Sequence, residues 1–306
     1  MERLVTIVPG LVSLSANIKK LKDFALAEDF AFYPPPPAPL PFHYTLERSA
    51  LPRPREWEYR FGYHSFARGV ISYHRPFART SLASAYNEQE RRFTVNSMYM
   101  KIPFRIGGIR SFGEVFFARI AFDLFQAGYM LCRGCAWRDE KGEAHTLILP
   151  AMNGKTSLLA GLLGGGKAVQ YVAEDLVILK PLAPGYEIYP TAAFRKNYGR
   201  RPNKELARLL SPASRIAEPL RGERLILAVT HTLDPAGKIQ KEIDFALGAS
   251  LFFLHDPQVQ LSLFAQGKTG ELLESIGRRF AGLRAEIRFC PLESMRDLFS
   301  DRGTTG

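Results

Sequence analysis

Apolar side chains recur near a 3.6-residue period in two parts of the chain, residues 112–129 and 269–283. Such a period places these side chains on one side of a helix, so both segments are predicted to be helical. Gly128 stands near the end of the first segment, where a glycine commonly terminates a helix. The apolar positions are Val115, Phe116, Ile120, Leu124 and Phe125 in the first segment and Leu272, Leu273, Ile276 and Phe280 in the second.

Shorter apolar or alternating runs, bounded by turn residues, predict strands elsewhere. Residues 47–119 are rich in arginine, tyrosine and phenylalanine, and they are predicted to form a strand-rich module. The charged turn 138–142 lies between two apolar runs and predicts a hairpin. Strands are predicted at 4–8, 92–102, 130–137, 144–149, 224–229, 250–254 and 284–289, and short helices at 203–210 and 292–299.

The first of these strands has an alternative interpretation. Residues 4–16 are apolar over about the length of the central region of a signal peptide. Glu2 weakens the basic start that a signal peptide needs, and Pro9-Gly10 interrupts the apolar run. A buried strand that leads into a turn therefore explains the pattern better.

Composition places the chain among water-soluble globular proteins, because 46% of its 306 residues are hydrophobic, 23% are charged and the mean hydropathy is −0.11. No uncharged apolar run approaches the roughly 18 residues of a membrane-spanning helix. The length favours two domains, an N-terminal α+β accessory module over 1–110 and a second domain over 111–306. Consecutive prolines make segment 33–41 extended, as a stiff connector or, alternatively, a docking site for a proline-recognising domain.

The charge balance favours an anionic partner. Lys and Arg number 41 against 30 Asp and Glu, so the net charge is +11 and the isoelectric point is about 9.6. Nucleic acid, phosphate and lipid all satisfy this balance. The interleaved arginines and aromatics of 47–119 could stack on single-stranded nucleic acid, although half-buried strands with solvated arginines are the simpler interpretation.

Three cysteines, Cys132, Cys135 and Cys290, are too few for a disulfide framework and indicate a reducing, cytoplasmic compartment. The Cys132–Cys135 spacing lacks the second pair that a zinc site needs and lies in a strand-like segment rather than at a helix start. We interpret these cysteines as structural. The six histidines show no metal-ligand spacing, so none is assigned to a metal.

The most informative segment reads strand, loop, helix. The predicted strand 144–149 is followed by a short loop that ends in Asn153-Gly154-Lys155-Thr156, and then by a helical run that starts at Ser157 and stops at Gly164-Gly165-Gly166. In a phosphate loop, backbone amides at a helix start face the phosphates, a lysine neutralises them and a hydroxyl binds Mg²⁺. Residues 154–156 supply the last three positions of that motif.

A pair of carboxylates follows this loop. Glu174 and Asp175 end the first of two apolar runs within 167–180. A carboxylate at a strand end beside a phosphate loop could coordinate a metal or take the proton of an attacking hydroxyl. The alternative is a solvated turn between two strands. The preceding loop favours the functional interpretation.

From about residue 131 to 180 the chain resembles the bacterial HPr kinase/phosphorylase family, which shares a P-loop fold with phosphoenolpyruvate carboxykinases. The resemblance rests on Gly154-Lys155-Thr156, the glycine-rich break and the Val-Ala-Glu-Asp that ends in Asp175. It implies an α/β fold with a P-loop nucleotide-binding core, ATP and Mg²⁺ as cofactors, and an ATP-dependent kinase acting on a hydroxyl of a protein, peptide or small molecule.

The resemblance also implies residue roles. Lys155 would hold the β- and γ-phosphates, Thr156 and Asp175 would hold Mg²⁺, and Glu174 would accept the hydroxyl proton. The catalytic residues would be Lys155, Glu174 and Asp175, and the nucleotide would be bound by Asn153, Gly154, Lys155, Thr156, Ser157, Arg195 and Lys196.

The chain departs from the family pattern at several positions. Leu149, Ala151 and Met152 stand where the family has Gly, Ser and Gly, and Cys132 stands near the expected catalytic histidine. Glu174 is longer by one methylene than the family's aspartate. These departures favour, as the alternative, a noncatalytic protein that binds a nucleotide or nucleic acid and retains the P-loop fold.

Basic residues cluster beyond the carboxylate pair, with Glu205 as the one acid among them. Arg195-Lys196 or Arg200-Arg201 could stabilise a transferring phosphoryl group, the stripe could contact a nucleic-acid backbone, or it could be a solvated face of the predicted helix 203–210. A second Gly-Lys-Thr, within Gln266–Gly270, is the rival phosphate site. The cluster consists of Arg195, Lys196, Arg200, Arg201, Lys204, Arg208 and Arg215.

Overall fold

The computed structural model is a mixed α/β structure made mostly of strands, and it divides into two compact units. Unit 1 comprises residues 1–127, 192–201 and 252–278, and unit 2 comprises 128–191, 202–251 and 279–306. The structure describes residues 3–17, 33–51, 53, 55–102, 109–148, 155–165, 168–182, 185–191, 215–222, 225–229, 252–268, 270, 271, 274 and 285–289. Within these ranges no helix combines the length and apolar character that a membrane crossing requires.

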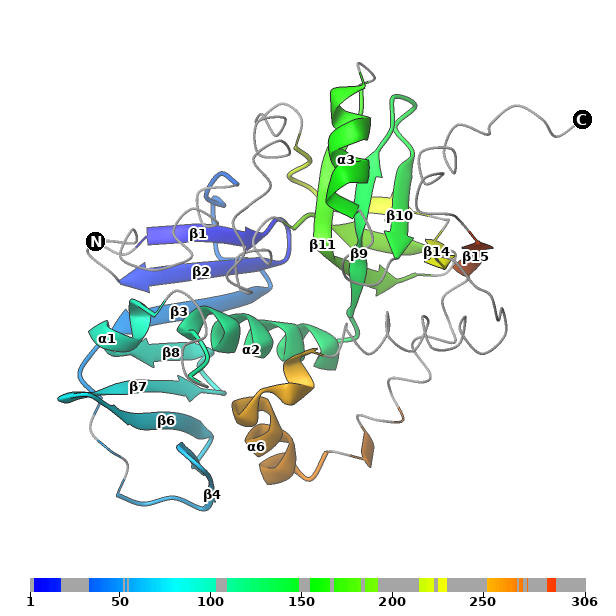
Figure 1. Cartoon of the computed structure of the whole chain (residues 1–306). Helices are drawn as coiled ribbons and strands as arrows, with labels where there is room; N and C mark the ends of the chain where they lie inside the picture. The colour runs from blue at the N-terminus through cyan, green and yellow to red at the C-terminus, as the bar shows by residue number, and fades with distance from the viewer. Residues whose placement is uncertain are drawn as a thin grey trace, which may run out of the picture. The chain divides into compact units, whose positions relative to one another are not determined.

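Unit 1 is built on an eight-stranded mixed sheet with the order β1-β2-β3-β8-β7-β6-β5-β4 (Figure 1). Strand β3 runs parallel to both of its neighbours, β2 and β8, and the remaining pairs are antiparallel. The strands are β1 (Arg3–Val8), β2 (Val12–Asn17), β3 (Phe42–Arg48), β4 (Tyr59–Phe61), β5 (His64–Ala67), β6 (Val70–Phe77), β7 (Thr80–Asn87) and β8 (Arg92–Val95). The predicted strand-rich module is thus confirmed, as is the N-terminal strand.

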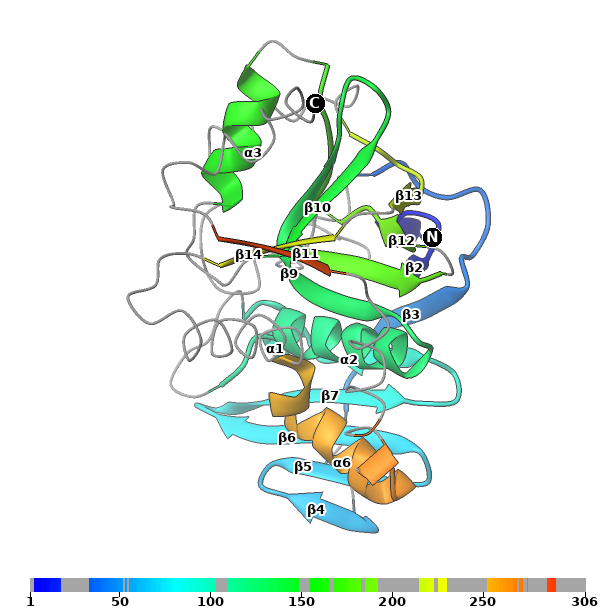
Figure 2. The same cartoon turned by 90° about the vertical axis from the view of Figure 1, so that its right-hand side faces the viewer.

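Helices α2 (Phe112–Gln126) and α6 (Pro257–Gln266) lie against the same face of this sheet (Figures 1 and 2). The predicted helix over 112–129 is confirmed, and Gly128 follows it with a φ of +95°. Ser111 caps the helix start by accepting a hydrogen bond from the Glu114 amide at 3.2 Å. Phe93 of β8 packs on Phe116 of α2 with ring centroids 5.0 Å apart, so an aromatic core joins helix and sheet.

A buried ionic network also joins these elements. Arg119 of α2 lies 3.0 Å from a carboxylate oxygen of Asp123 and 3.0 Å from one of Glu88. Its guanidinium donates to the Ser262 hydroxyl of α6 at 3.0 Å. Tyr44 donates to Asp123 at 2.8 Å. The network therefore ties both helices to the strands beneath them.

The proline-rich segment 33–41 belongs to unit 1 and is fastened to its first hairpin. The Thr6 hydroxyl donates to the Pro34 carbonyl at 2.6 Å, and the Leu40 amide donates to the Ser13 hydroxyl at 2.9 Å. Tyr33 is buried at its start. The segment bends at residues 37–38, and these two hydrogen bonds join it to β1 and β2.

Unit 2 contains a curled seven-stranded sheet with the order β13-β12-β11-β9-β10-β14-β15 (Figure 2). Strands β9 and β10 form the predicted hairpin, and β14 runs parallel to β10 and β15. The predicted strands at 224–229 and 284–289 are confirmed as β14 and β15. The elements are β9 (Met130–Arg138), β10 (Ala144–Ile148), α3 (Lys155–Gly164), β11 (Gln170–Pro181), β12 (Tyr186–Tyr189), β13 (Leu220–Gly222), β14 (Leu225–Val229) and β15 (Ala285–Phe289).

Two predictions about local structure were wrong. The apolar run 250–254, predicted as a strand, contributes to the 3₁₀ helix η4 (Phe252–His255), in which Phe253 is buried against Phe122 and Phe125 of α2. The strand predicted over 92–102 ends at Val95, because Asn96 caps the short helix α1 (Ser97–Met100). The predicted helices 203–210 and 292–299, and most of the one predicted over 269–283, lie outside the described residues.

Candidate functional site

The predicted phosphate loop falls between strand β10 and helix α3. Strand β10 ends at Ile148, and α3 begins at Lys155. Lys155, Thr156 and Ser157 therefore occupy the first turn of a ten-residue helix, the position at which a phosphate loop uses them. Asn153 and Gly154 lie outside the described residues. The helix buries Leu158, Leu159 and Ala160, which fix it against the sheet.

The carboxylate pair lies on β11, which is separated from β10 by the single strand β9. Gly134 of β9 pairs with Ile148 on one side and with Asp175 of β11 on the other. Neighbouring strands are about 4.8 Å apart, so the Cα atoms of Ile148 and Asp175 are separated by roughly 10 Å. Cys135 likewise stands between Leu147 and Glu174. The sheet thus places the backbone of the acidic pair level with the end of β10, with β9 between them.

Gly134 allows β9 to lie close to β10. A Cβ atom at this position would lie 2.3 Å from the Leu147 carbonyl oxygen and 3.2 Å from the Ile148 Cα. Both are backbone atoms that cannot move without distorting the hairpin. In the sequence, Gly134 falls between the two cysteines of the Cys-x-x-Cys spacing, and no local pattern marks it as a point of close contact.

The position of Glu174 and Asp175 differs from both interpretations that the sequence offered. They lie neither at a strand end nor in a solvated turn, but in the middle of the twelve-residue strand β11. The nine-residue strand β9 supplies pairing partners on both sides of them, which keeps the ladder continuous. The Glu174 side chain is only 4% exposed. A carboxylate is rarely buried so deeply without a structural or chemical role.

Most of the predicted basic cluster, including Arg195 and Lys196, lies outside the described residues. Arg215 is the one member within them, and its backbone forms an isolated parallel bridge with Tyr171 near the start of β11. The Ile216 amide donates to the Tyr171 carbonyl at 3.0 Å. The chain that follows the cluster is thus joined to the strand that carries Glu174.

The rival Gly-Lys-Thr has a different setting. Gly267 has a φ of +66° and ends helix α6, and the Lys268 amide donates to the Leu263 carbonyl at 3.2 Å. Gly267 is therefore explained as the left-handed residue that closes a helix. The sequence does contain a signal for α6, since Asp256-Pro257 is a strong helix start.

The two cysteines of β9 are buried thiols. Cys132 and Cys135 are both almost completely buried, and both lie within the strand. Burial raises the pKa of Cys132 to about 12. This agrees with the structural interpretation, because a redox cysteine needs a lowered pKa and access to solvent.

A group of possible metal ligands, not anticipated from the histidine spacing, lies at the β9–β10 turn. One ligand atom from each of Asp139, Glu143 and His145 falls within 4.8 Å of the others. The Asp139 carboxylate accepts hydrogen bonds from the amides of Lys141 and Glu143 at 3.0 and 2.9 Å, and its second oxygen lies 2.8 Å from His145 Nε2. These bonds close the hairpin, so the group is explained by the turn that it stabilises.

Comparison with known proteins gives no relative for this chain: no protein-family model matches it, and no curated protein sequence matches it.

Proposed function

We propose that unit 2 is an ATP-dependent phosphotransferase of the HPr kinase type, which transfers a phosphoryl group to a hydroxyl of a protein, peptide or small molecule. One observation carries this proposal. β10 leads through residues 149–154 into a helix that starts with Lys155 and Thr156, and an acidic pair lies on β11, across the single strand β9 from β10. Phosphoryl transfer needs a lysine at the phosphates together with carboxylates for metal and proton.

The donor set suits Mg²⁺ and ATP. A threonine hydroxyl and carboxylates are the hard oxygen ligands that Mg²⁺ prefers, and Mg²⁺ would neutralise charge on the transferring phosphoryl group. Thr156 and Asp175 would hold it. Lys155 and the first amides of α3 would bind the phosphates. Glu174 would accept the acceptor's hydroxyl proton, and its burial would shield this transfer from bulk water.

The chain offers its own control for ATP binding, since Gly-Lys-Thr occurs twice. We expect Lys155→Ala to weaken binding of ATP with Mg²⁺ by about 10- to 100-fold, because it removes a charge-assisted hydrogen bond to phosphate. Lys268→Ala, in the tripeptide that follows α6, should leave affinity within about twofold of the native value. Calorimetry measures both. Equal affinities for native protein and Lys155→Ala would reject the phosphate loop, and a selective loss in Lys268→Ala would move it to the second tripeptide.

Catalysis is tested separately from binding. Glu174→Gln keeps the shape of the side chain but removes the base, so we expect phosphoryl transfer to be lost while ATP affinity is retained. The readout is release of ADP in the presence of candidate hydroxyl acceptors, with mass spectrometry of the product. Normal turnover by Glu174→Gln would remove this residue from the mechanism. Absence of turnover in the native protein, with ATP binding intact, would favour a noncatalytic nucleotide-binding role.

A second candidate function, binding of single-stranded nucleic acid, is favoured by one specific surface of unit 1. Four exposed aromatics, Trp57, Tyr59, Phe61 and Tyr63, lie on and beside the terminal strand β4, and we call them the aromatic edge. Arg60 lies over the Trp57 ring at 5.8 Å. Six arginines stand against two glutamates in residues 53–79. Exposed rings interleaved with arginines are the elements from which single-strand binding sites are built.

This candidate predicts stacking and strong salt dependence. Phe61→Ala should weaken binding of a fluorescent oligothymidine by about 5- to 100-fold, as loss of one base–aromatic stack does elsewhere. Met98→Ala, which removes an exposed apolar side chain outside the aromatic edge, is the matched control. Anisotropy at increasing salt provides the second readout, because affinity should fall steeply. No binding at low salt would end this candidate.

A further inference from the structure

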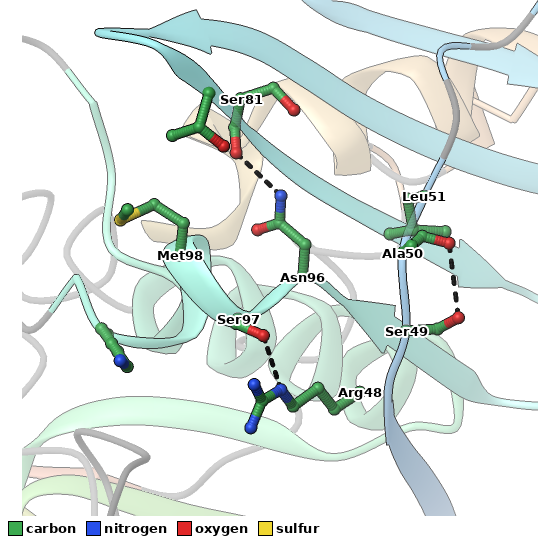
Figure 3. Close-up of a pocket in the computed structure, with 10 residues that line it drawn as sticks. Arg48, Ser49, Ala50, Leu51, Ser81, Asn96, Ser97 and Met98 are labelled. Carbon is green, nitrogen blue, oxygen red and sulfur yellow. Dashed lines mark hydrogen bonds between the residues drawn. The ribbon is translucent and has the colours of Figure 1, made fainter.

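An open pocket of about 580 Å³ lies at one end of the sheet in unit 1 (Figure 3). The end of β3, the start of β7 and helix α1 surround it. Because β3 and β8 are parallel neighbours, both reach their carboxyl ends here, at Arg48 and Val95. The chain continues from these ends in different directions, towards β4 and into α1 respectively. Where the chain leaves two adjacent parallel strands in different directions, a ligand-binding crevice commonly forms.

The lining is cationic. Arg48 and Lys101 both contribute to the pocket wall, and none of the described residues that line it is acidic. The other polar contributions are hydroxyls and one amide, from Ser49, Thr80, Ser81, Ser97 and Asn96. A concave surface with two positive charges, no carboxylate and several hydroxyls selects for an anion that also accepts hydrogen bonds.

The Arg48 guanidinium is held in place at the pocket. Its Nε donates to the Ser97 hydroxyl oxygen at 2.5 Å, as Figure 3 shows. Within the described part of the chain its two Nη groups have no hydrogen-bond partner. A guanidinium bound through Nε keeps an Nη donor edge for a ligand and is less free to rotate. The Ser97 hydroxyl accepts that bond, so its own proton stays available for donation.

Asn96, which precedes Ser97 in the pocket wall, is held in place as well. It donates from its side-chain nitrogen to the Ser81 carbonyl at 2.8 Å (Figure 3). Its side-chain oxygen accepts from the Tyr99 amide at 2.9 Å. The Asn96 backbone amide also donates to the Ala83 carbonyl at 2.9 Å. These bonds fix α1 to β7 and hold the pocket open before any ligand arrives, which reduces the entropy lost on binding.

We propose that this pocket binds the phosphate group of a small organic phosphomonoester. Arg48 and Lys101 hold the phosphate oxygens, and the hydroxyl-lined remainder of the pocket accommodates a polar, hydroxyl-bearing body. The pocket volume exceeds what a lone phosphate ion needs and falls in the range that drug-sized ligands occupy. This site lies within unit 1, so it is separate from the nucleotide site proposed for unit 2 and does not depend on it.

The test measures binding of three probes to the full chain by calorimetry: inorganic phosphate, O-phosphoserine and glucose 6-phosphate. Serine, a zwitterion, and glucose, an uncharged ring, are the counterparts that lack phosphate. We expect O-phosphoserine or glucose 6-phosphate to bind at least about tenfold more tightly than inorganic phosphate, since the body adds contacts. The counterparts without phosphate should not bind measurably.

Variants place the site. Arg48→Gln with Lys101→Gln should weaken phosphomonoester binding by at least about tenfold. Arg92→Gln removes one positive charge from an exposed ion pair with Glu90, outside the pocket, and should leave affinity within about twofold. Ala50→Trp fills the pocket from its exposed rim without changing any charge and should also abolish binding. Ala217→Trp, at an exposed alanine of unit 2, is its control.

The outcomes separate this site from the nucleotide site. Binding that persists in Lys155→Ala but is lost in Ala50→Trp supports the pocket. Loss in Lys155→Ala with full retention in the Arg48/Lys101 variant would overturn the proposal and assign phosphate to unit 2. Equal weakening by Arg92→Gln and by the Arg48/Lys101 variant would also overturn it, because attraction would then come from general surface charge. Unchanged melting temperatures of the variants establish that they fold.

Discussion

Unit 1 and unit 2 both bury charged side chains, but they do so in different surroundings. In unit 1, Arg119 and Asp123 lie between helix and sheet and contact each other at 3.0 Å. In unit 2, Glu174 lies within strand β11, beside the predicted phosphate loop. Buried charged side chains therefore have different roles in the two units. Where partners from several elements converge on a charge, it fixes the fold; where a carboxylate lies beside the predicted phosphate loop, it is a candidate for chemistry.

Tyr44 and Tyr86 of unit 1 show that its buried ionic network has a structural role. Burial, assisted by the negative charge of Asp123, raises the pKa values of Tyr44 and Tyr86 well above the ordinary value. Both hydroxyls donate to the same Asp123 oxygen, at 2.8 and 3.0 Å. They therefore stay protonated as donors, and one Asp123 oxygen accepts from both of them.

The largest expected effect tests whether this network carries stability. Asp123→Ala leaves the buried Arg119 short of a partner, so we expect the free energy of unfolding of unit 1 to fall by about 3–5 kcal/mol. Glu90→Ala breaks the half-exposed pair with Arg92 and should cost under about 1 kcal/mol. Denaturant unfolding measures both in a Trp137→Phe background, in which Trp57 reports on unit 1 alone. Equal costs for the two variants would contradict the contrast between buried and exposed pairs.

The corresponding test in unit 2 concerns the close approach of β9 and β10. Gly134→Ala places a Cβ against backbone atoms of Leu147 and Ile148, and we expect a loss of about 3 kcal/mol from overpacking. Gly270→Ala, in unit 1, where an added Cβ would meet nothing within 4 Å, should leave the unfolding transition of unit 2 unchanged and serves as the control. Unfolding is followed through the buried Trp137 in a Trp57→Phe background. A Gly134→Ala variant as stable as the control would show that the hairpin tolerates a wider spacing.

His64 provides the smallest effect, because it is a partly buried titratable group of unit 1 that the ionic network does not include. Burial, with a smaller contribution from Arg110, lowers the pKa of His64 from 6.5 to about 4. The unfolded chain then binds a proton at a pH where the native protein does not. Stability contributed by neutral His64 is therefore complete above about pH 6.5 and is lost as the pH falls towards 4.

The measurement compares pH slopes. Between pH 7 and pH 5, native protein should lose about 2 kcal/mol more unfolding free energy than His64→Gln, which cannot titrate. Identical slopes for native protein and His64→Gln would place the acid sensitivity of unit 1 elsewhere.

Local patterns predicted much of the fold, because they report on local physics. The helical period around Phe116, the charged turn before Ala144 and the apolar run at Leu225 all gave the right elements. The run around Phe253 failed because a short apolar segment fits a strand or a buried helical turn equally, and the rings of α2 decide between them. The break expected at Glu174 did not occur, since pairing with β9 overrode a local polar signal.

The candidate sites divide in the same way. The order of strand, loop and helix around Lys155 is visible in the sequence because the motif is contiguous. The pocket at Arg48 and Lys101 is not, since its walls come from residues that only the sheet brings together. The ionic network is equally hidden, because Glu88 and Ser262 meet Arg119 across long stretches of chain.

The discontinuity of unit 1 has a consequence for synthesis on the ribosome. Helix α6 and Phe253 complete this unit, yet they are translated only after residues 128–251, most of which belong to unit 2. At typical translation rates, this interval lasts on the order of ten seconds. During it, Arg119, Phe122 and Phe125 await contacts from a segment that does not yet exist. Until that segment is made, the nascent chain therefore exposes an unfinished core.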